Sequence, residues 1–139
     1  TGILEIFMEQ KKVLILDDSR IIRLSIKILL DKYNLTVLEL GKIEHLFSAA
    51  WRYKDVDLIL LDIELPELDG LTALETMQKD KNFMHIPVIV ISGHTDKQYV
   101  KKASSLGVID YIRKPYLASD LLARIEKVIG PLTLVYTDE

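Results

Sequence analysis

The sequence predicts an α/β fold in which one parallel β-sheet is covered by helices on both faces. Several runs are apolar at nearly every position, which is typical of strands buried on both sides of a parallel sheet. Segments with apolar residues at helical spacing lie between these runs, so that strand and helix alternate five times. Right-handed crossovers fold such a chain into three layers. The length of 139 residues fits a single domain.

Five segments are expected to form the strands of this sheet. Four of them are strongly apolar, and a weaker stretch that alternates between apolar and polar residues, 35–40, supplies the remaining strand. The strongly apolar runs are 13–16, 58–61, 88–91 and 108–112.

Five helices are expected between and after the strands. The first follows Ser19, a residue type that caps helices, and the last two end before Gly107 and Gly130. We expect Trp51, on the second helix, to cover the sheet. The apolar stripes that mark the helices are Ile22, Ile26 and Leu29–Leu30; Leu46, Ala49, Ala50 and Tyr53; Leu71, Leu74 and Met77; Val100, Ala103 and Leu106; and Leu121, Leu122, Ile125 and Val128.

The two ends of the chain are expected to lie outside this domain. Residues 1–11 are interpreted as an N-terminal extension or an added remnant, and residues 12–130 as the domain. Met8 is a candidate natural start, in which case the residues before it are the remnant or an upstream linker. Residues 131–139 are interpreted as a C-terminal tail. Its apolar part, 132–136, fits a sixth strand, a docking segment or the start of a linker.

The composition argues against several classes of partner. The 18 Lys and Arg residues against 21 Asp and Glu residues give a net charge of −3, without the excess of positive charge that binds nucleic acid or anionic lipid. The sequence has no cysteine, which excludes disulfides and thiolate zinc sites. No apolar run reaches the roughly 20 residues of a membrane span. We therefore expect a cytoplasmic protein that contacts neither nucleic acid nor membrane.

Polar residues stand at the expected carboxyl ends of four strands, which is where ligands bind in an open parallel sheet. Each has a plain structural explanation as a helix cap, a turn residue or a surface lysine. A single shared site explains all of them at once. The residues are Asp17 and Asp18 after the first strand, Asp62 after the third, Ser92 after the fourth and Lys114 after the fifth.

Together these residue types predict a site for phosphoryl transfer. Two carboxylates ~4 Å apart repel by about 4 kcal/mol at an effective dielectric constant of ~20, so converging acids need a cation or must take up protons. Oxygen ligands without Cys or His favour Mg²⁺. The metal, the Lys114 ammonium and the Ser92 hydroxyl can then hold phosphoryl oxygens, while the Asp62 carboxylate attacks phosphorus to give an aspartyl phosphate. The sequence contains neither a GxxxxGK[ST] loop nor a GxGxxG loop for a nucleotide.

Four motifs occur in a fixed order along the chain, at 13–19, 60–70, 91–93 and 107–116. The first ends in Asp17-Asp18-Ser19, the second runs from Asp62 to Gly70, the third is Ile-Ser-Gly and the fourth contains Lys114-Pro115. This set resembles the receiver domain of bacterial response regulators, which is phosphorylated on aspartate in two-component signalling. The resemblance covers about 12–129. It implies the flavodoxin-like, doubly wound sheet with strand order 2-1-3-4-5.

The resemblance also implies roles for individual residues. Asp62 is the implied phosphoacceptor, and Ser92 and Lys114 are the implied ligands of the phosphoryl oxygens. The peptide bond before Pro115 is cis in that family. The implied Mg²⁺ ligands are the carboxylates of Asp18 and Asp62, the carboxylate of Asp17 through water, and the backbone carbonyl of Glu64.

A conformational switch and its partners follow from the same resemblance. The added phosphoryl charge is expected to draw Ser92 toward it and to let Tyr111 move into the space that is left. This would change the surface formed by the fourth helix, the fifth strand and the fifth helix, which is where an output domain or a second copy of the chain would bind. The implied donor is a histidine kinase or a histidine phosphotransfer protein of a phosphorelay.

Two further residues are candidates for control of the lifetime of the phosphorylated state. Glu64 and His94 lie two residues after Asp62 and Ser92, where they can flank the path of the hydrolytic water. The alternative is that both are solvated loop residues.

Two other functions stay open. One is an α/β phosphatase or phosphomutase that uses an aspartyl phosphate, although the DxDx pattern of many such enzymes is missing after the first strand. The other is an interaction module that kept the fold without being phosphorylated. Turnover of an external substrate would indicate the first, but we expect none.

Overall fold

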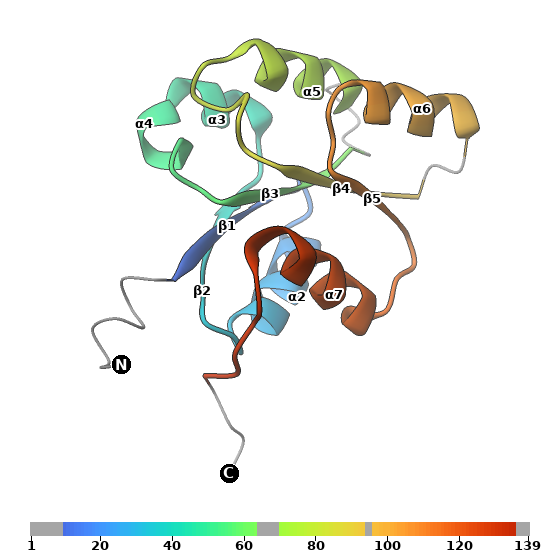
Figure 1. Ribbon diagram of the computed structural model, residues 1–139. Coiled ribbons are helices and arrows are strands. Elements are labelled where there is room, and N and C mark those ends of the chain that lie inside the picture. Colours follow the sequence, from blue (N-terminus) through green and yellow to red (C-terminus); the bar gives the residue numbers. More distant parts are fainter. Residues whose placement is uncertain (1–9, 64–69, 94–95, 136–139) are drawn as a thin grey trace.

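The computed structural model describes residues 10–63, 70–93 and 96–135 and confirms the expected sheet. Within these residues, five strands lie in the order β2-β1-β3-β4-β5, and all neighbouring strands are parallel. Figure 1 shows the sheet between two layers of helices. The strands are β1 (Lys11–Leu16), β2 (Leu35–Leu40), β3 (Leu58–Asp62), β4 (Val88–Ser92) and β5 (Asp110–Arg113).

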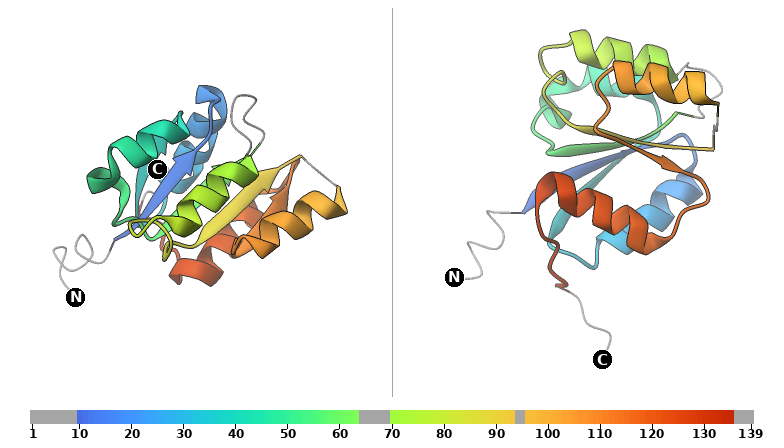
Figure 2. Two further views of the ribbon diagram at one scale, coloured as in Figure 1. Left: turned by 90° about the horizontal axis from the view of Figure 1, so that it is seen from above. Right: turned by 45° about the vertical axis from the view of Figure 1, so that its right-hand side comes forward.

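The helices divide between the two faces of the sheet, as the views of Figure 2 also show. Helices α2 (Arg20–Leu30) and α7 (Ala118–Ile129) cover one face. Helices α3 (Ile43–Ser48), α4 (Ala50–Tyr53), α5 (Gly70–Lys79) and α6 (Lys97–Ser105) cover the other. Within the described ranges, none of these helices is both long and apolar enough to cross a bilayer.

Successive side chains of the central strands enter two separate apolar clusters. Val13 and Ile15 pack beneath α2 and α7, whereas Leu14 and Leu16 pack beneath the opposite helices. Strands β3 and β4 are buried at every position, which is why their sequences are apolar up to the polar residue that ends each strand. A shift of one residue would exchange the two faces, so this packing fixes the register and with it the residues that end each strand.

The second expected helix is interrupted in the structure. Ala49, with φ −124° and ψ 42°, separates α3 from α4, which changes the direction in which the following residues point. Tyr53 is buried in the core, but Trp51 is 75% exposed. The expectation that Trp51 covers the sheet is therefore wrong, since it is Tyr53 of α4 that faces the core while Trp51 faces solvent.

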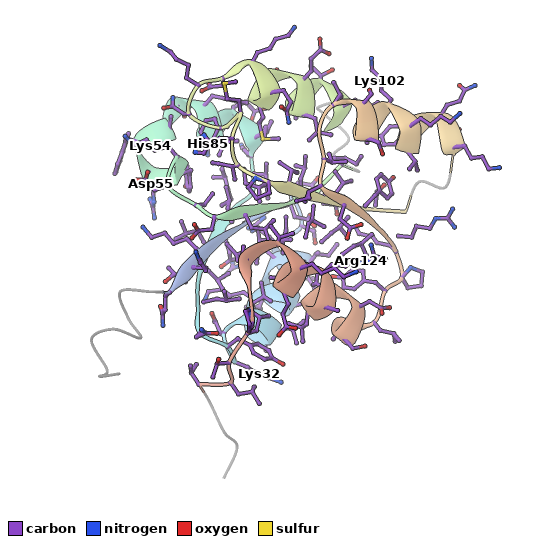
Figure 3. All side chains as sticks on the ribbon, in the orientation of Figure 1. Lys32, Lys54, Asp55, His85, Lys102 and Arg124 are labelled. Atoms are coloured by element: carbon purple, nitrogen blue, oxygen red, sulfur yellow. The ribbon has the colours of Figure 1, made fainter. Side chains whose placement is uncertain are left out.

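The segment after α7 lies against the turn between α2 and β2. The Asn34 N–H donates to the Thr133 carbonyl at 2.9 Å, and the Asn34 side-chain oxygen accepts from the Thr133 N–H at 2.8 Å. The Val135 N–H donates to the carbonyl of Lys32, a residue labelled at this turn in Figure 3. Tyr33 and Leu134 form one isolated antiparallel bridge. Residues 131–135 thus form a docking segment rather than a sixth strand of the sheet.

Gly70 begins α5 in close contact with the end of β3. A Cβ atom at Gly70 would lie 2.2 Å from Cβ and 2.9 Å from Cα of Ile63, so the backbone would have to move. We expect Gly70→Ala to lower the free energy of unfolding by about 1–3 kcal/mol, measured by urea denaturation. Thr72→Ala adds an alanine at an exposed position of the same helix and should change stability by less than about 0.5 kcal/mol. Equal stability of the two variants would contradict the close contact.

Candidate functional site

Four polar residues lie together at the edge of the sheet where the strands end. Asp17 directly follows β1, Asp62 and Ser92 are the last residues of β3 and β4, and Lys114 directly follows β5. The register brings them level, because Leu16 pairs with Leu61, Asp62 with Ile91 and Ser92 with Arg113. The parallel sheet therefore gathers residues from four separate segments of the chain.

Two of the acids are buried and in contact. Asp17 and Asp62 are 3% and 5% exposed, and their side chains share a hydrogen bond. Asp17 Oδ1 also accepts from the Ser19 N–H at 2.8 Å, which fixes the turn into α2. Asp18 lies beside this pair in the chain and is exposed. Over residues 10–63, 70–93 and 96–135, no three acidic or histidine side chains form a ready-made metal cluster. The carboxylate pair is thus the centre of the site.

Lys114 supplies the positive charge. Its Nζ forms an ion pair with Asp62 Oδ2, and its backbone N–H donates to the Ser92 carbonyl at 2.9 Å. The bond between Lys114 and Pro115 is cis, as the resemblance implies. Ser92 is fully buried at the end of β4. An ammonium group, a hydroxyl group and two carboxylates are thus held by adjoining strands.

The electrostatic environment favours a further cation. Burial and the hydrogen bond with Asp62 raise the pKa of Asp17 to about 7, against the opposing effects of the Ser19 N–H and the Lys114 charge. One ammonium therefore faces two buried acids and does not fully compensate them. Mg²⁺ is bound through one or two carboxylates and keeps several waters, so this donor set fits the ion.

The shifted pKa of Asp17 predicts how metal binding and stability depend on pH. The folded-state pKa lies above the usual value of 3.8, so between these two pH values the folded state holds a proton that the unfolded state has lost. Stability without metal therefore falls as pH rises toward about 7. Mg²⁺ bound at this pair would compete with that proton. We expect Mg²⁺ to raise the melting temperature by several degrees at about pH 8 and by much less at about pH 5.5.

Thermal unfolding with and without Mg²⁺ at both pH values measures this effect. Asp17→Asn removes the titrating group, so we expect its smaller response to Mg²⁺ to be the same at both pH values. An Mg²⁺ effect in the wild type that does not change with pH would contradict the prediction.

Of the remaining residues that the sequence analysis singled out, some lie outside the described residues and one, Tyr111, is described. Glu64 and His94 lie outside the described residues, as do Pro66 and Asp69. Tyr111 is a half-buried residue of β5 that packs against the cluster beneath α3–α6.

Two residues close to the site were not expected from the sequence. The Tyr116 phenol is half-buried, and burial raises its pKa above the usual value of 10.0. Tyr116 and Lys114 line an open cavity of about 540 Å³ together with Ile21, Ile22, Ser25 and Pro115. The other residue is Arg23, whose Nη1 donates to the Asp17 carbonyl at 2.6 Å. The sequence shows Arg23 near the start of a helix but gives no sign that it points inward.

Comparisons with known proteins agree with this geometry. The sequence profile of the family described as "Response regulator receiver domain" matches residues 13–126. The chain is 34% identical over 121 residues to the transcriptional regulatory protein KdpE of Staphylococcus aureus, covering 86% of this chain and 50% of that protein. It is 30% identical over 120 residues to the cell cycle response regulator CtrA of Brucella ovis, covering 85% and 50%. The chain spans about half the length of these relatives.

Solved structures show the same fold. A response regulator from Thermotoga maritima superposes with a TM-score of 0.74 at 29% identity, covering 88% of this chain and 99% of that one. The receiver domain of the sensor histidine kinase PA1611 from Pseudomonas aeruginosa, solved with a magnesium ion in its active-site cleft, gives 0.75 at 23% identity with the same coverage. The match of the family profile to most of the chain, the relatives and the shared fold lead to one conclusion: the chain belongs to the response regulator receiver domains of two-component signalling.

Proposed function

We propose that this chain is a phosphorylation switch in which Asp62 accepts a phosphoryl group from a phosphohistidine. The observation that carries the proposal is the contact of the buried Asp62 carboxylate with both the Lys114 ammonium and the Asp17 carboxyl. A carboxylate at the end of a central strand, next to a cation and a second acid, has the surroundings that a nucleophile in phosphoryl transfer needs.

The chemistry uses residues that the sheet already holds together. A carboxylate oxygen of Asp62 attacks phosphorus, and the P–N bond of the donor breaks with its electron pair staying on the imidazole. The Ser92 hydroxyl and the Lys114 ammonium stabilise the negative charge on the phosphoryl oxygens. Mg²⁺ would supply further positive charge, held by Asp17, Asp18, Asp62 and the Glu64 carbonyl. The magnesium ion in the PA1611 receiver domain supports this assignment.

The same proposal includes a switch of surface. Ser92 would follow the new phosphoryl group, Tyr111 would move with it, and the surface of α6, β5 and α7 would change. In the structure Arg124 of α7 forms an ion pair of 2.6 Å with Asp110 of β5 on this surface, and Figure 3 labels this arginine. We propose that an output domain or a second copy of the chain binds there.

The proposed function also identifies the binding partners and the boundaries of this domain. The donor is a histidine kinase or a histidine phosphotransfer protein, and the chain turns over no external substrate. Glu64 and His94 tune the lifetime of the aspartyl phosphate. With a net charge of −3, the chain itself contacts neither nucleic acid nor membrane. Residues 12–130 form the receiver unit, against which residues 131–135 dock.

Labelling with a small phosphodonor tests the proposal. Phosphoramidate with Mg²⁺ should add one phosphoryl group, detected by intact mass spectrometry and located at Asp62 by peptide mapping after borohydride reduction. Absence of label would support an interaction module instead. Repeated release of phosphate from p-nitrophenyl phosphate would support the phosphatase alternative.

A further inference from the structure

Arg23 of α2 is a largely buried cation beside the acidic site. Its side chain is 16% exposed, and its Nη1 donates to the backbone carbonyl of Asp17 at 2.6 Å. Its Nε is buried and has no hydrogen-bond partner among the described residues, although Glu39 Oε1 lies 3.5 Å away. A guanidinium loses much hydration when it is buried, so a placement that leaves one N–H unsatisfied calls for an explanation.

The short bond to Asp17 explains this placement. A charge-assisted hydrogen bond is stronger than a neutral one, and here it goes to a main-chain carbonyl while the nearest carboxylate stays beyond hydrogen-bond geometry. The hydrogen bond to the Asp17 carbonyl is thus the shorter contact of the guanidinium, and Glu39 adds an ion pair at 3.5 Å that lacks hydrogen-bond geometry.

This bond completes the restraint of Asp17. The Asp17 N–H donates to the Leu40 carbonyl at 3.1 Å, its side chain accepts from the Ser19 N–H, and its carbonyl accepts from Arg23. One hydrogen bond thus restrains each of the two peptide planes that flank Asp17, and a third restrains the direction of its side chain. The carboxyl group is consequently held toward Asp62.

Gly41, directly after β2, gives the guanidinium its space. A Cβ atom at Gly41 would lie 2.9 Å from Arg23 Nη1, the same atom that bonds Asp17. Gly41 does not have a positive φ, so its missing side chain matters here for the room that it leaves beside the guanidinium. Arg23 thus joins the loop of the acidic site to the end of β2.

We propose that Arg23 is a positioning residue for the acidic site, which holds Asp17 in the orientation that binds Mg²⁺ without touching the metal or the phosphoryl group. This rests on the proposed function. Mutation of a residue that hydrogen-bonds to a metal ligand typically lowers metal affinity by about 10–100-fold. We expect an effect at the lower end of this range, because Arg23 acts through the main chain.

Two variants disturb the same contact in different ways. Arg23→Met keeps an unbranched apolar stem and removes the donors, whereas Gly41→Ala keeps the charge and pushes the guanidinium away. We expect each to weaken Mg²⁺ binding about 10-fold in calorimetric titrations. Glu39→Gln is the matched control, because it removes the carboxylate at 3.5 Å and leaves the bond to Asp17. Its Mg²⁺ affinity should equal that of the wild type, and Arg23→Lys should recover part of the lost affinity.

A second measurement does not depend on the metal. Without Mg²⁺, the NMR signal of the Ser19 amide reports its hydrogen bond to Asp17 Oδ1, and we expect it to shift in Arg23→Met and Gly41→Ala but not in Glu39→Gln. An unmoved Ser19 signal and unchanged Mg²⁺ affinity in both variants would overturn the positioning role while leaving the phosphorylation of Asp62 intact. A wild type that neither binds Mg²⁺ nor accepts phosphate would instead refute the proposed function.

Discussion

Asp62→Asn is expected to abolish phosphorylation of the protein by a small phosphodonor with Mg²⁺. The amide has the shape of the carboxylate but lacks the negatively charged oxygen that attacks phosphorus. Because Asp62 is the proposed nucleophile, we expect the rate of labelling to fall by at least about 10³-fold. The measurement is a time course by intact mass spectrometry, with far-UV circular dichroism to confirm that the variant is folded.

Asp55→Asn is the control for this experiment. Asp55 is exposed on the connection between α4 and β3, where Figure 3 labels it. The Asp55→Asn protein should therefore be phosphorylated at the wild-type rate. If Asp62→Asn were labelled at the wild-type rate, the phosphoacceptor would be another residue and the proposed mechanism would be wrong.

Lys114→Met is expected to slow the labelling of Asp62 by about 10²-fold, because one preorganised positive charge on the phosphoryl oxygens is lost. The ion pair with Asp62 is also lost, which leaves the two buried acids without their nearest cation. The initial rate at saturating phosphodonor measures the effect.

A different lysine and a conservative change separate charge from general effects. Lys102→Met on the exposed face of α6 should be labelled at the wild-type rate. Lys114→Arg keeps the charge but spreads it over a planar group that cannot act as a point charge, so an intermediate rate is expected. A Lys114→Met protein that is labelled as fast as the wild type would remove Lys114 from the proposed site.

The central strands could be predicted because a strand that is buried on both faces has an almost continuously apolar sequence. Strands β3 and β4 are buried at every position, and all their residues before the last one are apolar. The order of the strands is not encoded in such runs and came from the resemblance to a known family. The break at Ala49 left no local signal, because Ala49 and Ala50 favour a helix by themselves. Ile43 and Leu46 before the break and Tyr53 after it are all buried, and tertiary packing of this kind commonly outweighs helix propensity.

In the site, too, some residues could be predicted from the sequence and others could not. Asp17, Asp62, Ser92 and Lys114 could be expected to meet, because each follows or ends a strand of one parallel sheet. Arg23 could not be recognised, since its inward direction depends on the space beside Gly41, which lies on a different segment of the chain. Contacts made through a backbone carbonyl leave no residue-type pattern to read.

The docking of residues 131–135 bears on how this unit should be produced for physical study. The match to the family ends at residue 126, yet Leu132 packs on the cluster beneath α2 and α7, and its N–H donates to the Glu126 side chain. Truncation at the end of α7 would leave the Asn34 N–H and the Lys32 carbonyl to water and uncover the flank of that cluster. Recombinant versions of the isolated unit should accordingly continue through Val135.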